Sequence, residues 1–159
     1  MIAEIMSNVV KNVSEQVGYD VKYLFGSTLS VVNQITLLQR QQDVYPAIIL
    51  FQEGLTEKKY HYYTEANIQK MAICTLTKYD LTDMQRIHTT FKDVIYPCYD
   101  AFLSELQKIH SGYELIINRA DIPFFNESGN KHTFNQMVDG CVLRPFTMKI
   151  ENKVLCKYL

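Results

Sequence analysis

Tyr45-Pro46-Ala47-Ile48-Ile49-Leu50-Phe51 is the stretch that decides the fold of this 159-residue chain. An apolar run follows the proline, and Gln52-Glu53-Gly54 ends it. A short apolar run between turn residues is typical of a core strand, and proline is tolerated at the start of a strand because it cannot donate a ladder hydrogen bond. The stretch therefore predicts a strand over 47–51, and with it a sheet against which the other elements pack.

A helix and a short strand are predicted at the N-terminal end. Apolar residues recur every three or four positions, which predicts an amphipathic helix over 2–17. Gly18 follows as the C-terminal cap of this helix. The alternating stretch 21–25 then predicts a strand or an extended arm.

A second helix is predicted from a cap at Ser27 or Thr28 to about Gln41. The buried stripe expected for it consists of Leu29, Val32, Ile35 and Leu38. After the core strand, the aromatic and polar segment 58–64 leads into a strand over 71–76. The alternation of residues in that strand predicts burial mainly on one face.

The longest predicted helix runs from about Met84 to Ile109, with Thr82-Asp83 as its cap. Pro97 lies inside this helix. Because proline lacks a backbone N–H and its ring clashes with the preceding turn, Pro97 is expected to kink or break the helix. Gly112 is expected to end the helical region.

Strands are expected on both sides of a long loop in the C-terminal part of the chain. The segment 113–118 predicts a short strand, and turn residues make 119–135 the expected exposed loop or hairpin arm. Alternating apolar and polar residues over 141–150 predict further strands, and a last strand is expected over 154–158.

Together these elements predict an α+β fold. Its mixed, mainly antiparallel sheet is flanked by the N-terminal helix and by the long proline-kinked helix. A chain of this length lies within the usual size of one domain and buries roughly two thirds of its unfolded surface. We therefore expect a single domain over residues 1–159.

The charge balance argues against a polyanionic partner. The chain has 16 Lys and Arg against 17 Asp and Glu, a net charge of −1. Such a chain has no global field to attract nucleic acid or an anionic membrane. No basic leader region is visible, and no apolar run approaches the roughly 18 residues of a membrane span. A soluble protein made in the cytoplasm is expected.

The motifs of common enzyme classes are missing from the sequence. It has no phosphate-binding loop, dinucleotide fingerprint, nucleophile elbow or zinc-protease helix, and its four histidines lack metal-ligand spacing. The four cysteines are expected to be buried reduced thiols, since each lies in an apolar stretch: Cys74, Cys98, Cys141 and Cys156. We expect no enzymatic activity, no cofactor and no metal site.

A cysteine nucleophile remains the sharpest catalytic alternative. Cys98 has His88 and His110 on the same predicted helix, at spacings that put the groups roughly 15–18 Å apart along a straight helix. The side chains cannot touch unless the chain bends sharply at Pro97. Packing of Cys98 between Tyr96 and Tyr99 is the simpler interpretation.

The run Tyr60-His61-Tyr62-Tyr63 beside Lys58-Lys59 has two interpretations. Aromatic rings beside lysines can stack on the bases of single-stranded nucleic acid. In a chain without net positive charge, tyrosines more often serve as a subunit contact. We favour the contact, and the candidate interface residues are Tyr60, Tyr62, Tyr63, Asn126, Asn130 and Lys131.

Three blocks of residues, taken in order, form a recognisable pattern. The first comprises the leading helix, Tyr23-Leu24-Phe25-Gly26 and the stretch 45–51. The second comprises the strand 73–77 followed by Arg86, Phe91, Ile95-Tyr96-Pro97, Tyr99 and Phe102-Leu103. The third comprises 139–143 and 146–150. This order resembles the tail-terminator and tail-completion proteins found at the head-to-tail junction of tailed phages and prophages.

The resemblance implies a structural role in a virion. Members of this family have an α+β fold with a mixed sheet flanked by helices, and they form a ring, commonly of six subunits, that caps the tail tube and meets the head connector. The implied partners are other copies of the chain and the tail-tube or head-connector proteins. The family has no cofactor and no catalytic residues. Its members assemble in the cytoplasm of the bacterial host and end in the virion tail or neck.

Overall fold

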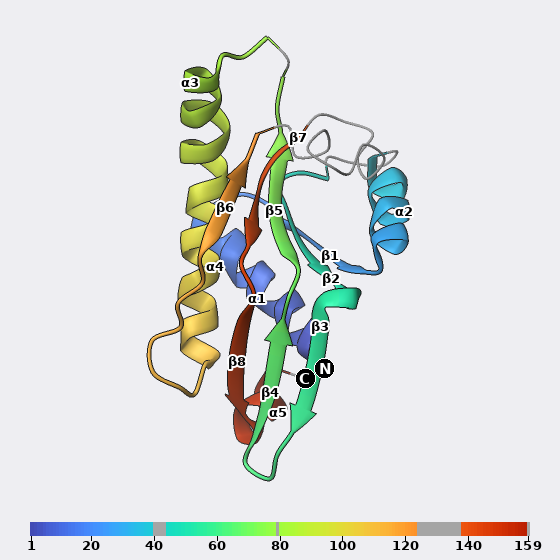
Figure 1. The fold of residues 1–159 in the computed structure, drawn as a ribbon, viewed down its shortest axis with the longest axis vertical. Coiled ribbons are helices and arrows are strands. Elements are labelled where there is room, and N and C mark those ends of the chain that lie inside the picture. Colours follow the sequence, from blue (N-terminus) through green and yellow to red (C-terminus); the bar gives the residue numbers. More distant parts are fainter. Residues whose placement is uncertain (40–43, 79, 124–137, 159) are drawn as a thin grey trace.

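The computed structural model describes residues 1–39, 44–78, 80–123 and 138–158, which form one compact α+β domain (Figure 1). The helices are α1 (Ile2–Val17), α2 (Thr28–Gln39), α3 (Asp83–Arg86), α4 (Tyr96–Ile109) and α5 (Asn152–Tyr158), with a 3₁₀ turn η1 (Gln52–Gly54) and a π-helical segment η2 (Ile87–Ile95). The strands are β1 (Lys22–Gly26), β2 (Ala47–Phe51), β3 (Leu55–Lys59), β4 (Tyr63–Ile68), β5 (Met71–Leu76), β6 (Arg119–Ile122), β7 (Val138–Leu143) and β8 (Phe146–Glu151). The predicted α+β class is confirmed.

The strands form two sheets rather than the one that was predicted. The larger sheet has the order β1-β2-β5-β7-β6, and only its β1–β2 pair is parallel. The smaller sheet, β3-β4-β8, is antiparallel throughout. Three stretches of chain run through both sheets: β2 continues into β3, β4 into β5, and β7 into β8 (Figure 1).

Gly54 is required where β2 continues into β3. The backbone N–H of Phe51 donates to the carbonyl oxygen of Lys70, and that of Gln69 donates to the carbonyl oxygen of Gly54. These bonds draw the two strands so close that a Cβ on Gly54 would lie 2.6 Å from the backbone nitrogen of Lys70. Only glycine leaves room for this approach.

Strand β2 is buried on both faces, as its uninterrupted apolar sequence predicts. Ile48 and Leu50 belong to the core beneath α1 and α4. Ala47, Ile49 and Phe51 belong to a second core beneath α2. Strand β5 is also buried on both faces, so the expectation that it is buried mainly on one face is wrong. The reason is its position between β2 and β7, with a hydrophobic core on each side.

Helix α1 confirms the predicted helix over 2–17 and its cap. Gly18 adopts the left-handed conformation, with φ of 80°, and its N–H donates to the carbonyl oxygen of Ser14. The apolar stripe of α1 faces the sheets and α4: Ile2, Ile5, Met6, Val9, Val10 and Val13.

The helical region from α3 to α4 begins at the predicted cap, since Thr82 and Gln85 form a capping box. The chain stays helical through Pro97, so the predicted break does not occur. The disturbance instead takes the form of wide π turns in η2, where the N–H of Tyr96 bonds to the carbonyl oxygen of Phe91, five residues earlier. Pro97 lies in the first turn of α4, where its missing N–H is tolerated.

Helix α2 buries a different stripe from the predicted one. Val31 and Ile35 are buried, whereas Leu29 is 71% exposed. Val32 and Leu38 are half-buried. The apolar residues of α2 itself are distributed around the helix, so their spacing does not predict which side is buried. The sequence from Arg40 onward lies outside the described part of this helix.

Two expectations for the C-terminal part are wrong. The segment 113–118 lies against α4, where the N–H of Leu115 bonds to the side chain of Gln107, and it belongs to none of the described strands. Residues 119–122 form the edge strand β6, which pairs antiparallel with β7 as in the predicted hairpin arm, and 124–135 lie outside the described residues. The segment expected as a strand over 154–158 belongs to helix α5, whose Leu155 packs into the core beneath α1.

We predict that Gly54→Ala lowers the free energy of unfolding by about 1–3 kcal/mol, because the added methyl group meets backbone rather than a movable side chain. Urea denaturation followed by circular dichroism measures the change. Thr56→Ala, at an exposed position of the adjoining strand, is the control and should change stability by less than about 0.5 kcal/mol. Equal stability of the two variants would contradict the required close approach.

Candidate functional site

The turn between β3 and β4, which we call the tip, consists of Tyr60, His61 and Tyr62. The N–H of Tyr60 donates to the carbonyl oxygen of Tyr63 over 2.8 Å and closes the hairpin. The tip lies at one end of the elongated molecule, away from α2 (Figure 1). Its position makes its side chains available to a partner.

Asn152, the first residue of α5, holds the tip in place. Its side-chain amide donates to the carbonyl oxygens of Tyr60 and His61 over 3.0 and 2.9 Å. Its backbone N–H donates to the carbonyl oxygen of Tyr62, and its side-chain oxygen accepts from the hydroxyl of Thr64. Asn152 appears in the sequence only as a turn residue, and nothing local links it to a turn some ninety residues earlier.

The aromatic rings of the tip are ordered by one another. Tyr60 and Tyr63 stack with their ring centroids 4.6 Å apart, and His61 meets the ring of Tyr62 edge-on at 4.4 Å. Tyr62 is 78% exposed. Because Tyr60 and Tyr63 cover each other, Tyr62 is the tyrosine of this group that presents most of its surface.

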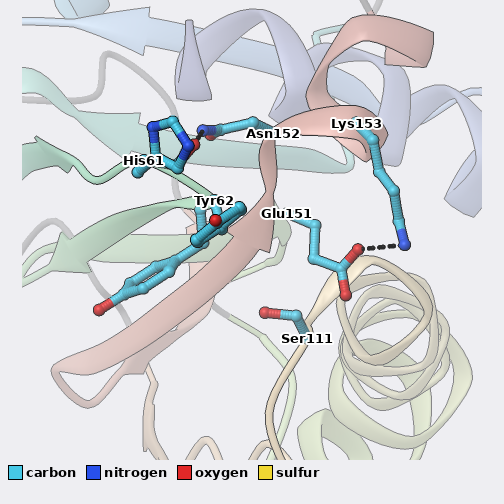
Figure 2. A pocket seen from close by; sticks show the side chains of 7 residues that line it. His61, Tyr62, Ser111, Glu151, Asn152 and Lys153 are labelled. Carbon is cyan, nitrogen blue, oxygen red and sulfur yellow. Dashed lines mark hydrogen bonds and ion pairs between the residues drawn. The ribbon is translucent and has the colours of Figure 1, made fainter.

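A concavity of about 510 Å³ lies beside the tip (Figure 2). Several of its polar groups already have partners: Glu151 pairs with Lys153 at 2.7 Å, and the hydroxyl of Ser111 donates to the carbonyl oxygen of Lys149. The bond to Glu151 raises the pKa of Lys153. The concavity is lined by His61, Tyr62, Tyr63, Ser111, Glu151, Asn152 and Lys153. These pairings leave Glu151, Lys153 and Ser111 engaged with groups of the chain itself.

A second surface, the α2 face, consists of Leu29, Asn33 and Leu37. These residues recur at four-residue spacing, so they lie along one side of the helix. Leu29 is 71% exposed and Leu37 is 59% exposed. The sequence of α2 contains no charged residue from Thr28 to Gln39. The sequence prediction assigned Leu29 to the core and so missed this surface, although the absence of charge was visible.

Cys98, the alternative nucleophile, is buried. Its Sγ lies 3.5 Å from the hydroxyl oxygen of Tyr19, and burial raises the pKa of the thiol. His110 accepts a hydrogen bond from the backbone N–H of Lys149 through Nδ1, while His88 is exposed. In the part of the chain that the structure describes, no hydrogen bond joins Cys98 to either histidine.

The remaining predicted residues fall into two groups. Asn126, Asn130 and Lys131 lie outside the described residues. Among the residues that are described, no group of three or more His, Cys, Asp or Glu side chains is placed to hold a metal ion. Within the same ranges, no helix has both the length and the apolar character needed to cross a membrane.

A buried ion pair links the start of the long helix to the larger sheet. The guanidinium of Arg86 donates to Asp139 of β7 at 3.2 Å and to the hydroxyl of Thr77 at 2.7 Å. Thr90 donates to the second carboxylate oxygen of Asp139. Arg86 and Asp139 are both fully buried, so their pairing fixes the helix on the sheet and is unavailable to a ligand.

We predict that Asn152→Asp destabilises the chain by about 1–3 kcal/mol, because a carboxylate cannot donate to the carbonyl oxygens of Tyr60 and His61. Urea denaturation at neutral pH measures the effect. Lys153→Ala, at the next position and exposed, should change stability by less than about 0.5 kcal/mol. A neutral Asn152→Asp substitution would show that the tip does not depend on these bonds.

We also predict that one of the four thiols reacts quickly in the folded protein. Cys156 is exposed, which corrects its expected burial, while the other three cysteines are buried. Burial raises the pKa of Cys141 to about 12, which leaves almost no thiolate at neutral pH. Titration with a thiol reagent should therefore modify Cys156 alone in the folded chain and all four thiols in urea. Rapid native modification of Cys98 would contradict this and favour the enzyme alternative.

No protein-family model, curated protein or solved structure matches the chain. Its function is therefore inferred from its own residues and fold.

Proposed function

We propose that this chain is a structural assembly protein of a phage or prophage tail, a tail-terminator or tail-completion protein that forms a ring at the head-to-tail junction. The observation that carries the proposal is the presence of two uncharged, exposed surfaces, the tip and the α2 face, at separate places on one compact α+β domain. Such surfaces serve contacts with other proteins.

The fold supports the proposal. The resemblance implies a mixed sheet flanked by helices, and the chain has a mixed five-stranded sheet with α1 and α4 over one face and α2 over the other. Most of the helix residues that carry the resemblance are buried: Arg86, Phe91, Ile95, Tyr99 and Phe102. These residues position the long helix, so the contacts with partners fall to the exposed surfaces.

The two surfaces also support a ring. A closed ring is built from heterologous contacts, in which one patch of a protomer meets a different patch of its neighbour. The tip and the α2 face differ in shape and residue type, and they lie on different parts of the molecule (Figure 1). A protein with one such patch would be limited to two-fold pairing.

The tip favours a protein contact over single-stranded nucleic acid. Base stacking needs free ring faces, and the stacking of Tyr60 on Tyr63 already uses two of them. Lys149 lies over the ring of Tyr63 and within 4.0 Å of Glu65, so its charge is already matched. The remaining Tyr62 suits an anchor in a protein interface, since it offers a large area at low entropy cost.

The proposal is tested in the bacterium that carries the gene. We expect the chain to co-purify with tail particles and to be detected in them by mass spectrometry. Deletion of the gene should leave filled heads and separate tails, visible by negative-stain electron microscopy, and a plasmid copy should restore joined particles. Normal particles from the deletion strain, or tails that lack the chain, would contradict the proposed function.

A further inference from the structure

We propose that His110 makes the contact between the end of α4 and the outer edge of β8 sensitive to pH, so that protonation of its imidazole breaks the bond that closes this contact. The inference is independent of the proposed function, because it involves no partner and no resemblance. It follows from the ring nitrogen that accepts the bond, the place of that bond on an edge strand, and the positive charge beside the ring.

His110 is the residue at which α4 ends. Its backbone N–H still donates to the carbonyl oxygen of Leu106 over 2.9 Å, and its own φ and ψ of −73° and 125° are extended. Its side chain accepts through Nδ1 from the backbone N–H of Lys149 over 3.2 Å. A ring nitrogen accepts a hydrogen bond only when it carries no proton, so this bond requires a neutral imidazole with its proton on Nε2. Protonation of the ring therefore removes the bond.

Ser111 completes the contact. Its backbone N–H and its hydroxyl both donate to the carbonyl oxygen of Lys149, over 2.7 and 3.0 Å. Strand β8 is the last strand of the smaller sheet and pairs with β4 on one side. The N–H and the carbonyl oxygen of Lys149 are thus bonded by residues 110 and 111 instead of by a further strand. Because unpaired backbone groups on an edge invite another strand, this contact protects the edge of β8 at Lys149.

The surroundings of the ring disfavour its charged form. Partial burial and the ammonium group of Lys149 lower the pKa of His110. Lys149 also lies 4.0 Å from Glu65 of β4, while Lys108 of α4 pairs with Glu105. The carbonyl end of α4 favours a charged ring, and loss of the Nδ1 bond opposes it. Burial, the lysine and the bond therefore act in the same direction.

The sign of the pH effect follows from this direction. Because the pKa of His110 in the folded chain lies below the ordinary imidazole value of about 6.5, the unfolded chain takes up the proton first on acidification. The stability that this contact contributes is complete above about pH 6.5 and declines as the pH falls below it. Mild acidification is therefore enough to loosen the end of α4 from β8.

Gly112 leaves room for the ring in this position. A Cβ at residue 112 would overlap Nε2 of His110. The imidazole therefore lies against the backbone of Gly112 while its Nδ1 bonds to Lys149. Since the end of a side chain moves more easily than the backbone, Gly112→Ala should displace the ring and break the bond even at neutral pH.

Nuclear magnetic resonance on the unaltered chain tests the bond directly. In a titration from about pH 8 to about pH 4.5, the ring of His110 should titrate below about 6.5 from the tautomer protonated at Nε2. The amide signal of Lys149 should move with the same midpoint. Lys149→Gln keeps the backbone N–H and removes the neighbouring charge, so it should raise the midpoint of His110. A midpoint above the ordinary value, or a Lys149 amide that does not follow the ring, would overturn the inference.

Urea denaturation at about pH 7.5 and about pH 5.5 measures the consequence for stability. Between these two conditions, the unfolding equilibrium constant of the unaltered chain should rise about two- to tenfold more than that of His110→Asn, as expected for one hydrogen bond. Asparagine keeps an acceptor at the same place in the side chain but does not titrate. His88→Asn is the matched control, because His88 is exposed on η2. It should keep the pH dependence of the unaltered chain.

Equal pH dependence in the unaltered chain and in His110→Asn would show that the contact does not respond to pH, and would overturn the inference. Circular dichroism checks that the variants fold. If His110→Asn does not fold, Gly112→Ala replaces it and should lose the same part of the pH dependence, because its displaced ring no longer bonds to Lys149.

Discussion

The rest of the structure depends on the ladder that residues 63–76 form with residues 138–151. Its register is the same in both sheets, with Ile68 opposite Phe146 and Met71 opposite Leu143. Between these pairs, the positions that face the core beneath α1 change from even to odd numbers in both strands at the same point. Because side chains alternate with a period of two, a slip of one residue would turn the apolar residues of β4 and β8 toward solvent. In β5 and β7, which are buried on both faces, the same slip would exchange the residues of the two cores.

The residues at the junctions between the two sheets allow the core-facing positions to change from even to odd numbers. Pro145 lies between β7 and β8, where no ladder hydrogen bond is needed from it, and the preceding N–H of Arg144 donates to Asn118 instead. Gly54 allows β3 to approach Lys70 closely. The smaller sheet thus stays attached to the larger one and carries the tip to the end of the molecule (Figure 1).

Much of the fold could be predicted because its signals are local. The spacing in α1, the glycine cap after it and the apolar run of β2 each depend on neighbouring residues. The elements that were predicted wrongly depend on contacts with residues far away in the sequence. Helix α2 shows no preferred face until the sheet covers Val31 and Ile35, and 113–118 has the alternation of a strand without a partner strand. Of the candidate site, the tyrosines were predicted, while the part played by Asn152 required the contact between the start of α5 and the tip.

Strand β2 contributes side chains to both hydrophobic cores. Ile48 and Leu50 lie in one core, and Ala47, Ile49 and Phe51 lie in the other. Displacement of β2 from one core would therefore also expose apolar residues of the other core. Loosening of α2 from its side therefore weakens the support of α1 and α4 on the opposite side. We expect this coupling to make melting of the two layers a single cooperative event, without a partly folded form in which one layer survives alone.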